Sequence, residues 1–296
     1  MPSLKEVRIR IASVKSTQQI TSAMKMVAAS KLRRAQTAIL RLRPYAAKLQ
    51  EFLMNLSSSL DSTEAGSVYS RQRNPDKVLL IVISSNRGLC GAFNTNIIKK
   101  ANHVINEKYT AQYKSGQLSL ITIGKKATEF FRKRKYNIIE SHDSIFDHLT
   151  FENIAPIAEK IMKLFEDKQY DRIEIIYNHF KNAGSQSIEH EQFLPVRLVD
   201  TKDSRAKAVK VDYIFEPNKD EIIRDLIPKS LKIQFYKTLL DSVASEHGAR
   251  MTAMHQATDN AKELLKDLSL AYNKARQAAI TREILEIVGG AEALRG

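Results

Sequence analysis

Apolar residues recur along the N-terminal segment at alternating steps of three and four positions. Within residues 4–56 the phase of these steps never changes, and thirteen of the sixteen positions are apolar. A 3.5-residue repeat of this length is typical of a helix in a coiled coil. The three polar positions cluster between 18 and 25. There the apolar residues Ile20, Met24 and Val27 lie beside the stripe, so the apolar face is displaced to one side of it. We therefore expect a second packing surface beside the seam between the two helices.

The C-terminal segment shows the same alternation, with an apolar stripe through residues 247–279. We expect one helix over residues 220–288, which begins near Pro217 and is stopped by Gly289-Gly290. Each terminal helix would be far too long for a globular core to cover. The two helices are therefore expected to pack on each other as one antiparallel hairpin. The alternative is two unrelated amphipathic helices that pack on one core.

Three residues inside these helices are expected to weaken them. Pro44 should kink or locally break the N-terminal helix near residues 40–43, because proline lacks the N–H of an intrahelical hydrogen bond. Pro228 and Gly248 are weak points of the C-terminal helix, because both residues are poor helix formers.

Between the helices, short apolar runs alternate with helical segments. Strands are predicted at 78–84, 118–123, 136–139, 172–179, 187–198 and 211–215, and helices at 92–113, 125–135 and 153–167. This alternation predicts a three-layer, Rossmann-like domain with a largely parallel sheet. The polar stretches 57–74 and 200–210 are expected to be mobile linkers.

The predicted fold class is α/β, with a long antiparallel coiled coil of the N- and C-terminal helices and a central three-layer α/β domain. The predicted organisation is an N-terminal coiled-coil helix (1–57), a linker (58–75), the central domain (76–216) and a C-terminal coiled-coil helix (217–296).

Charge is unevenly distributed along the 296 residues, whose formal net charge is +14. The first fifty residues hold eleven Lys or Arg and one acidic residue, whereas residues 230–296 are nearly balanced. This asymmetry predicts an acidic partner for the N-terminal helix. Charge alone leaves open whether that partner is nucleic acid, a membrane or a protein.

Two features bear on the compartment. The longest apolar run, Val78–Ile83, falls far short of the roughly 20 residues that span a bilayer, and the charged start predicts no signal peptide. The single cysteine, Cys90, excludes an intramolecular disulfide and a cysteine-based zinc cage. A reducing, cytosolic compartment fits best.

The loop after the first predicted strand, residues 84–94, is where an open α/β sheet binds phosphates. It contains only G-x-x-G, at Gly88 and Gly91, and the Gly124-Lys125-Lys126 corner is not a P-loop. A tight turn that lets strand and helix pack closely is favoured over a nucleotide site. Cys90 has no recognisable base and the histidines form no metal-binding pattern, so no catalytic, cofactor-binding or metal-binding residue is predicted.

Several stretches resemble the gamma subunit of F-type ATP synthases. Residues 17–33, TQQITSAMKMVAASKLR, are similar to its N-terminal signature. Further similar segments are 245–251, 257–261, 272–284, 286–291 and the loop 87–91, RGLCG. Asn86 stands where the family usually has Asp, and Gly248 where it usually has alanine, at a cost to the helix of roughly 1 kcal/mol if exposed. The cysteine pair of the chloroplast type is absent, so thiol control is not expected.

The resemblance implies a central-stalk rotor of a proton-translocating F-type ATP synthase, which transmits torque between the membrane c-ring and the catalytic sites of the beta subunits. One gamma copy would stand in a ring of three alpha and three beta subunits and would contact epsilon and the c-ring. It would lie at the cytoplasmic face of the bacterial inner membrane and have no catalytic site, no cofactor and no nucleic-acid partner. The alternatives are a basic coiled-coil protein that binds nucleic acid or an anionic membrane, and an α/β enzyme with helical arms.

The resemblance also implies residues that contact the beta subunit. In this reading, an acidic segment of beta meets Met24, Lys25, Lys31 and Arg33. Positions that hydrogen-bond the catch loop of beta are matched by Arg250, Arg276 and Gln277, and positions that affect coupling by Thr281 and Glu283. Without the resemblance, each Lys or Arg is interpreted as part of a solvated helix face. A bearing tip, apolar on more than one side, is formed by Ile280, Ile284, Leu285, Ile287 and Val288. It would exclude water inside a collar and make few directional bonds to it.

Overall fold

The structure is a computed structural model, and it describes residues 3–60, 68–196 and 219–293. The chain forms two compact units. Unit 1 comprises residues 1–28 and 250–296, and unit 2 comprises residues 29–249. Two long helices, α1 (Leu4–Leu60) and α7 (Lys219–Ala293), contribute a segment to each unit.

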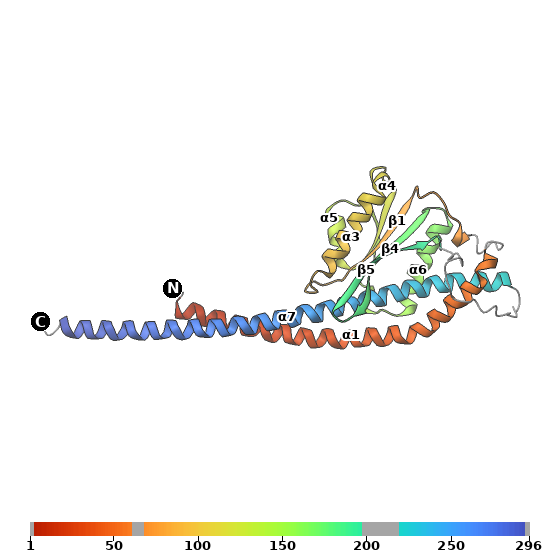
Figure 1. The fold of residues 1–296 in the computed structure, drawn as a ribbon. Coiled ribbons are helices and arrows are strands. Elements are labelled where there is room, and N and C mark those ends of the chain that lie inside the picture. The colour runs from red at the N-terminus through yellow and green to blue at the C-terminus, as the bar shows by residue number, and fades with distance from the viewer. Residues whose placement is uncertain (1–2, 61–67, 197–218, 294–296) are drawn as a thin grey trace. The chain divides into compact units, whose positions relative to one another are not determined.

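In unit 1 the segments of α1 and α7 run antiparallel against each other (Figure 1). The hydroxyls of Thr21 and Thr258 are hydrogen-bonded across the seam at 2.8 Å, and Lys25 lies opposite His255. Every predicted stripe position in residues 4–28 of α1 and 251–279 of α7 is buried or half-buried. The predicted coiled-coil seam, and with it the fold class, is confirmed.

The polar positions of the α1 stripe do not displace the seam. Thr21 is buried in it, and Lys25 is half-buried. The apolar neighbours Ile20 and Val27 are instead 56% and 57% exposed. The second apolar surface predicted beside the seam therefore exists, but it is open in this chain.

The pairing in unit 1 ends before α7 does. Because Thr21 lies opposite Thr258, an antiparallel register brings Leu4 to about residue 275 of α7. The predicted stop at Gly289-Gly290 is wrong, because α7 continues to Ala293. Neither glycine adopts the positive φ of a helix-terminating cap, and the helix-forming residues around them maintain the backbone.

Unit 2 contains a five-stranded sheet in the order β3-β2-β1-β4-β5. Its strands are β1 (Val78–Ile83), β2 (Leu118–Ile123), β3 (Ile138–Ser141), β4 (Arg172–Asn182) and β5 (Ser185–Leu194). The first four are parallel, and β5 returns antiparallel to β4 as a hairpin. All six side chains of β1 and of β2 are buried, because helices cover both faces of the sheet.

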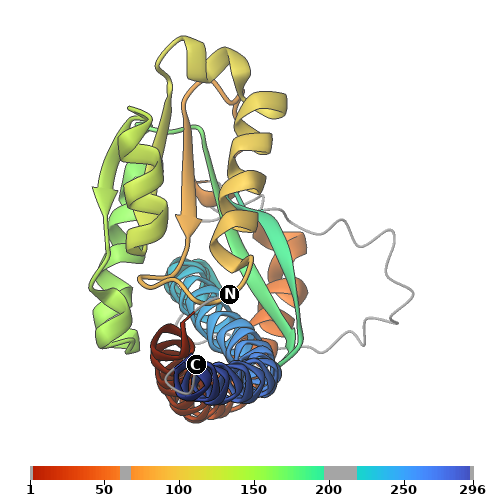
Figure 2. The same ribbon diagram turned by 90° about the vertical axis from the view of Figure 1, so that its left-hand side faces the viewer.

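Helices lie on both faces of the sheet (Figure 2), and each face has its own apolar core. One core joins the sheet to α3 (Phe93–Lys108) and α5 (Lys125–Lys133). The opposite core joins it to α6 (Phe151–Glu166) and to the unit 2 segment of α7, through Leu231, Phe235 and Leu239. The predicted three-layer architecture is therefore confirmed, and α7 itself forms part of one layer.

Some predicted boundaries differ from the observed ones. The single helix expected at 92–113 is divided at Tyr109 into α3 and a short α4 (Thr110–Lys114). Tyr109 is buried, and its hydroxyl donates to the carboxylate of Glu174 on β4, which fixes the chain at this point. A 3-10 turn at Ile145–Asp147 precedes α6, and β3 begins at Ile138 rather than at residue 136.

The prolines do not interrupt the helices. Both α1 and α7 continue past their internal prolines, Pro44 and Pro228, so of the predicted kink or local break near residues 40–43 the break does not occur. One missing N–H costs a single hydrogen bond, which long flanking helical segments tolerate. The expected strand at 211–215 and linker at 200–210 lie outside the described residues, as does 61–67 of the other predicted linker.

Candidate interaction surfaces and the loop at the sheet edge

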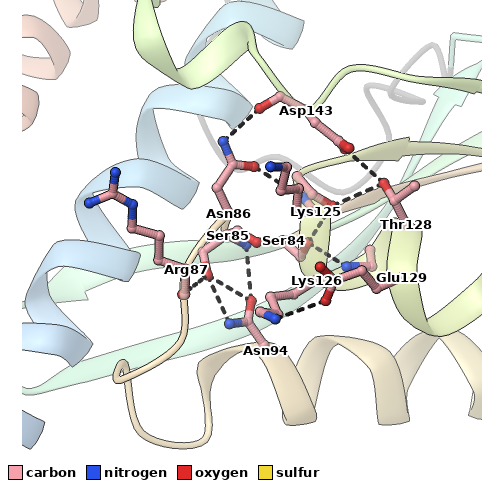
Figure 3. Close-up of polar contacts among 12 residues, drawn as sticks. Ser84, Ser85, Asn86, Arg87, Asn94, Lys125, Lys126, Thr128, Glu129 and Asp143 are labelled. Atoms are coloured by element: carbon pink, nitrogen blue, oxygen red, sulfur yellow. Dashed lines mark hydrogen bonds and ion pairs between the residues drawn. The ribbon is translucent and has the colours of Figure 1, made fainter.

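The polar side chains of the loop after β1 form hydrogen bonds within the loop and to the segments beside it (Figure 3). Asn94 at the start of α3 accepts from the backbone N–H of Ser85, and the Ser85 hydroxyl donates to the carbonyl of Arg87. Asn86 donates to the carbonyl of Asp143 at 2.6 Å and accepts from the N–H of Lys125. These bonds tie the loop to both neighbouring helices.

The N-terminus of α5, which could otherwise bind an anion, is used by the chain itself. The N–H of Lys125 donates to Asn86 Oδ1, that of Lys126 to the carbonyl of Ser85, and that of Ala127 to the Ser84 hydroxyl. A phosphate at this helix end would have to replace three internal acceptors. The geometry therefore supports the predicted structural turn over a nucleotide site.

The glycine that permits close packing here is Gly124, rather than Gly88 or Gly91. A Cβ at Gly124 would lie 2.3 Å from the carbonyl oxygen of Ser84, and its φ is +100°. Neither Gly88 nor Gly91 has any atom within 4 Å of such a Cβ, although Gly91 has the φ of a left-handed turn. The close contact that requires glycine joins Gly124, directly after β2, to Ser84, directly after β1. The spacing of residues along the chain does not reveal a contact between two strand ends.

Glu174 on β4 is a buried carboxylate of unit 2 whose pKa is strongly shifted. Its side chain is 1% exposed and accepts from His190 and Lys108 at 2.5 Å each and from the Tyr109 hydroxyl at 2.6 Å. Burial alone raises the pKa of Glu174, but these hydrogen bonds outweigh it and lower the pKa to about 2. Burial and the bond to Glu174 raise the pKa of Tyr109. The cluster joins α3, β4 and β5, so it is a structural clamp.

No three metal-ligating side chains gather anywhere in residues 3–60, 68–196 and 219–293. Cys90 is buried beside the amide of Asn94 at 3.3 Å. Across the same described ranges, no helix combines the length and hydropathy needed to cross a bilayer.

Of the predicted beta contacts on α1, Met24 and Lys25 belong to unit 1. Both are half-buried, and the Lys25 ammonium lies 3.4 Å from Nδ1 of His255 on α7. The same nitrogen lies 3.2 Å from the carboxylate of Asp259. Lys25 is thus held at the edge of the seam rather than projecting freely.

The other two predicted basic contacts, Lys31 and Arg33, lie in unit 2 and are exposed. Arg33 lines an open hollow of about 420 Å³ on α1, together with Ser30, Arg34, Thr37, Ala38 and Arg41. The hollow is on the side of α1 opposite the apolar stripe. Of the residues that line this hollow, the family resemblance indicated only Arg33. The i, i+3, i+7 spacing of Arg34, Thr37 and Arg41 was the signal that could have added them.

The predicted contacts on α7 separate into two groups within unit 1. Arg250 is 8% exposed and interacts within the chain. Arg276, Gln277, Thr281 and Glu283 are exposed, and the Thr281 hydroxyl donates to the carbonyl of Gln277. Their distance along α7 from His255, the residue opposite Lys25, is about 30 Å or more, at 1.5 Å per residue. These residues therefore do not form one site with Lys25.

Beyond Ala279 every described residue of α7 is exposed. The exposed fractions of the tip residues are 48% for Ile280, 55% for Ile284, 65% for Leu285, 70% for Ile287 and 49% for Val288. Five large apolar side chains on one unpaired helical end form a surface that is typical of an interaction site.

Comparisons with known proteins agree over the whole chain. The ATP synthase family model matches residues 3–294. The ATP synthase gamma chain of Christiangramia forsetii is 56% identical over 296 residues, which covers all of both chains. The ATP synthase gamma chain of Cytophaga hutchinsonii is 55% identical over 294 residues, or 99% of each chain.

Solved structures show the same fold. A chain of the Tetrahymena thermophila mitochondrial ATP synthase, from a structure of the central stalk and c-ring, is 25% identical, with a TM-score of 0.58 over 80% of this chain and 99% of that one. A chain of the Euglena gracilis mitochondrial ATP synthase is 22% identical, with a TM-score of 0.70 over 98% of this chain and 94% of that one. The alternative of a basic protein that binds nucleic acid or a membrane finds no support in these relatives. From its match to the family model and its identity to full-length relatives, the chain belongs to the family of ATP synthase gamma chains.

Proposed function

We propose that this gamma chain is the rotor of the central stalk of a proton-translocating ATP synthase, and that it transmits torque between a membrane c-ring and catalytic sites on beta subunits. The proposal is supported by the relatives, which are named as gamma chains, and by the Tetrahymena structure, which is described as central stalk and c-ring. A paired-helix shaft suits this role because a coiled coil resists bending and twisting.

The observation that carries the proposal is the unpaired end of α7. In residues 280–293 the helix continues without a partner segment of α1 and exposes its apolar side chains. A surface of this kind is stabilised by an apolar collar, and a rotating part requires that the collar exclude water without directional bonds. A ring of three alpha and three beta subunits would supply it, with one gamma copy inside.

The proposed beta contacts are the exposed Lys31, Arg33, Arg276, Gln277, Thr281 and Glu283, the half-buried Met24 and Lys25, and the buried Arg250. Arg34 and Arg41 are added because they line the same hollow as Arg33. Between residues 30 and 41 every charged side chain of α1 is positive. This favours an acidic segment of beta as the partner of that face. Epsilon and the c-ring are the proposed partners of the central stalk at its membrane-proximal end.

The chain itself supplies no catalytic group in this proposal, because ATP is made or hydrolysed on beta. Support comes from the edge of the sheet, where the first N–H groups of α5 donate to oxygens of the chain itself. The proposed location is the cytoplasmic face of the bacterial inner membrane, where the c-ring would hold the complex.

Co-purification tests the proposal. A tag on this chain should recover alpha, beta and epsilon subunits with ATP hydrolysis activity, at one copy of this chain to three of beta by quantitative mass spectrometry. A fluorescent bead on the stalk should rotate when ATP is added. Recovery of the chain without these subunits, or ATP hydrolysis by the isolated chain, would count against the rotor function.

A further inference from the structure

One stripe of α7 in unit 2 contacts the β4–β5 hairpin through two polar side chains and a glycine, without large apolar side chains. The stripe consists of Asp241, Ser245 and Gly248, at i, i+4 and i+7, which places them on one helical face. All three are buried. Figure 1 shows the tip of this hairpin reaching the helix.

Asp241 and Ser245 bind the hairpin directionally. The Asp241 carboxylate lies 3.1 Å from Nδ1 of His179 on β4. The Ser245 hydroxyl donates to the carbonyl of Asn178 at 3.0 Å, and the Gln186 amide donates to the carbonyl of Ser245 at 3.3 Å. Both strands of the hairpin are thus bonded to α7.

Gly248 lets the tip of the hairpin approach the backbone of α7. A Cβ at Gly248 would lie 3.0 Å from the carbonyl oxygen of Ala183 and 3.5 Å from its Cα. The residue that the sequence marks as a weak point of the helix is therefore the place where another backbone rests against it.

These contacts differ in kind from the rest of the α7 contact with the sheet. That contact consists of apolar side chains such as Leu231, Phe235 and Leu239, and apolar burial does not depend on direction. Hydrogen bonds weaken steeply when their angle changes, so they resist rotation of the helix about its own axis.

The charges around Asp241 come from three elements. Burial raises the pKa of Asp241, while His179 on β4, Lys237 on α7 and Arg43 on α1 act to lower it. A buried carboxylate that loses its partner is costly, so rotation of α7 that separates Asp241 from His179 would be opposed.

We propose that the β4–β5 hairpin fixes the rotational setting of α7 and is the contact through which the α/β domain passes torque into that helix. Asp241, Ser245 and Gly248 are its positioning residues on α7, and His179, Asn178 and Ala183 are their partners on the hairpin. The inference rests on the proposed rotor function and specifies where the force enters the shaft.

The test compares two double variants in the assembled, membrane-bound complex. Asp241→Asn with Ser245→Ala removes the ion pair and one hydrogen bond to the hairpin. Asp267→Asn with Ser269→Ala makes the same substitutions on the exposed face of α7, where Ser269 bonds to its own helix. The readouts are the torsional stiffness of the stalk, from the angular fluctuations of an attached bead, and ATP-driven proton pumping relative to ATP hydrolysis.

We expect the first variant to lower the torsional stiffness and the pumping per ATP hydrolysed, with hydrolysis itself maintained, and the second to leave all three unchanged. Ser245→Ala alone, which removes a single donor, provides the same comparison if the double variant assembles poorly. Unchanged stiffness in the first variant, or an equal loss in both, would overturn the inference. Failure of the unaltered complex to rotate or pump would instead overturn the rotor function.

Discussion

The hydroxyl of Thr258 on α7 lies 2.8 Å from that of Thr21 on α1, in the buried seam of unit 1. Thr258 also lies 2.7 Å from the carbonyl of Met254, and Thr21 lies 3.0 Å from the carbonyl of Gln18. One hydroxyl therefore donates across the seam while the other bonds to its own helix. A polar pair at this position specifies the axial register of the two helices, which an apolar seam alone leaves free to slip.

Replacement of Thr258 by valine should lower the free energy of unfolding by about 1 kcal/mol, because it removes one buried hydrogen-bonding partner and retains the other. Replacement of Thr21 and Thr258 together should cost less than the sum of the single changes, since each single change already removes the hydrogen bond that the two hydroxyls share. Denaturant unfolding of the purified chains measures all three values. Additive losses would show that the two hydroxyls do not interact.

Glycines in α7 should respond differently to alanine. Gly289 has no atom within 4 Å of an added Cβ, so Gly289→Ala should increase local helix stability by about 1 kcal/mol. Gly248→Ala should not show this gain, because its Cβ would crowd the carbonyl of Ala183. Hydrogen exchange of the amides near each site measures the two effects. An equal gain at both positions would contradict the close contact at Gly248.

The Glu174 cluster predicts a specific dependence of stability on pH. The pKa of Glu174 in the folded chain, about 2, lies below its ordinary value of 4.5, so the carboxylate stabilises the fold above pH 4.5. This contribution is lost as the pH falls toward 2. Glu174→Gln should cost about 1.5–3 kcal/mol near neutral pH, as expected for hydrogen bonds to a charged group.

Thermal unfolding of the two proteins between pH 2 and 7 provides the measurement. The difference in unfolding free energy should be constant above pH 5 and should shrink below pH 4.5. Glu107→Gln serves as the control, because Glu107 forms an exposed pair with His103 on α3. A difference that does not depend on pH would show that the Glu174 carboxylate is not the titrating group.

Arg250 and Arg276 should differ when each is replaced by alanine. Arg250 is buried, so Arg250→Ala should lower both the ATPase activity of the assembled complex and the stability of the chain, while leaving the isolated chain folded. Arg276 is exposed, so Arg276→Ala should lower activity alone. ATPase assays and melting curves of the same preparations separate the two effects. Unchanged coupled ATP synthesis in the Arg250 variant would remove its assignment as a beta contact.

A cross-link from the tip to beta should block turnover less than one from the basic face of α1. Ile284→Cys and Arg33→Cys place a thiol in each region, each paired with a cysteine introduced on the facing surface of beta, and the natural thiol of Cys90 is buried. An apolar bearing makes few directional bonds to its collar, so a tether there should oppose rotation less. ATP hydrolysis before and after oxidation measures the block. Equal inhibition at the two positions would contradict the bearing.

The periodic pattern of apolar residues along the sequence predicted much of the fold. The stripe positions in residues 4–28 of α1 and 251–279 of α7 are buried or half-buried, because a 3.5-residue repeat gives the partner helix a single apolar face. The strand positions Val78–Ile83 and Leu118–Ile123 were predicted to the residue or within one residue, because continuous apolar runs of this length match parallel strands covered on both faces. The beta contacts on both helices stay a prediction, since they depend on a partner surface.

Sequence alone determined the helix pair, the α/β order and the family, because these depend on local periodicity and on long runs of matching residues. Tertiary structure decided the role of Gly248, the continuity of α7 past Gly289-Gly290 and the burial of Arg250. Each of these depends on what lies opposite a residue in space. A glycine that weakens an isolated helix has a different function when the backbone of Ala183 rests against it, and no spacing within the helix itself encodes that approach.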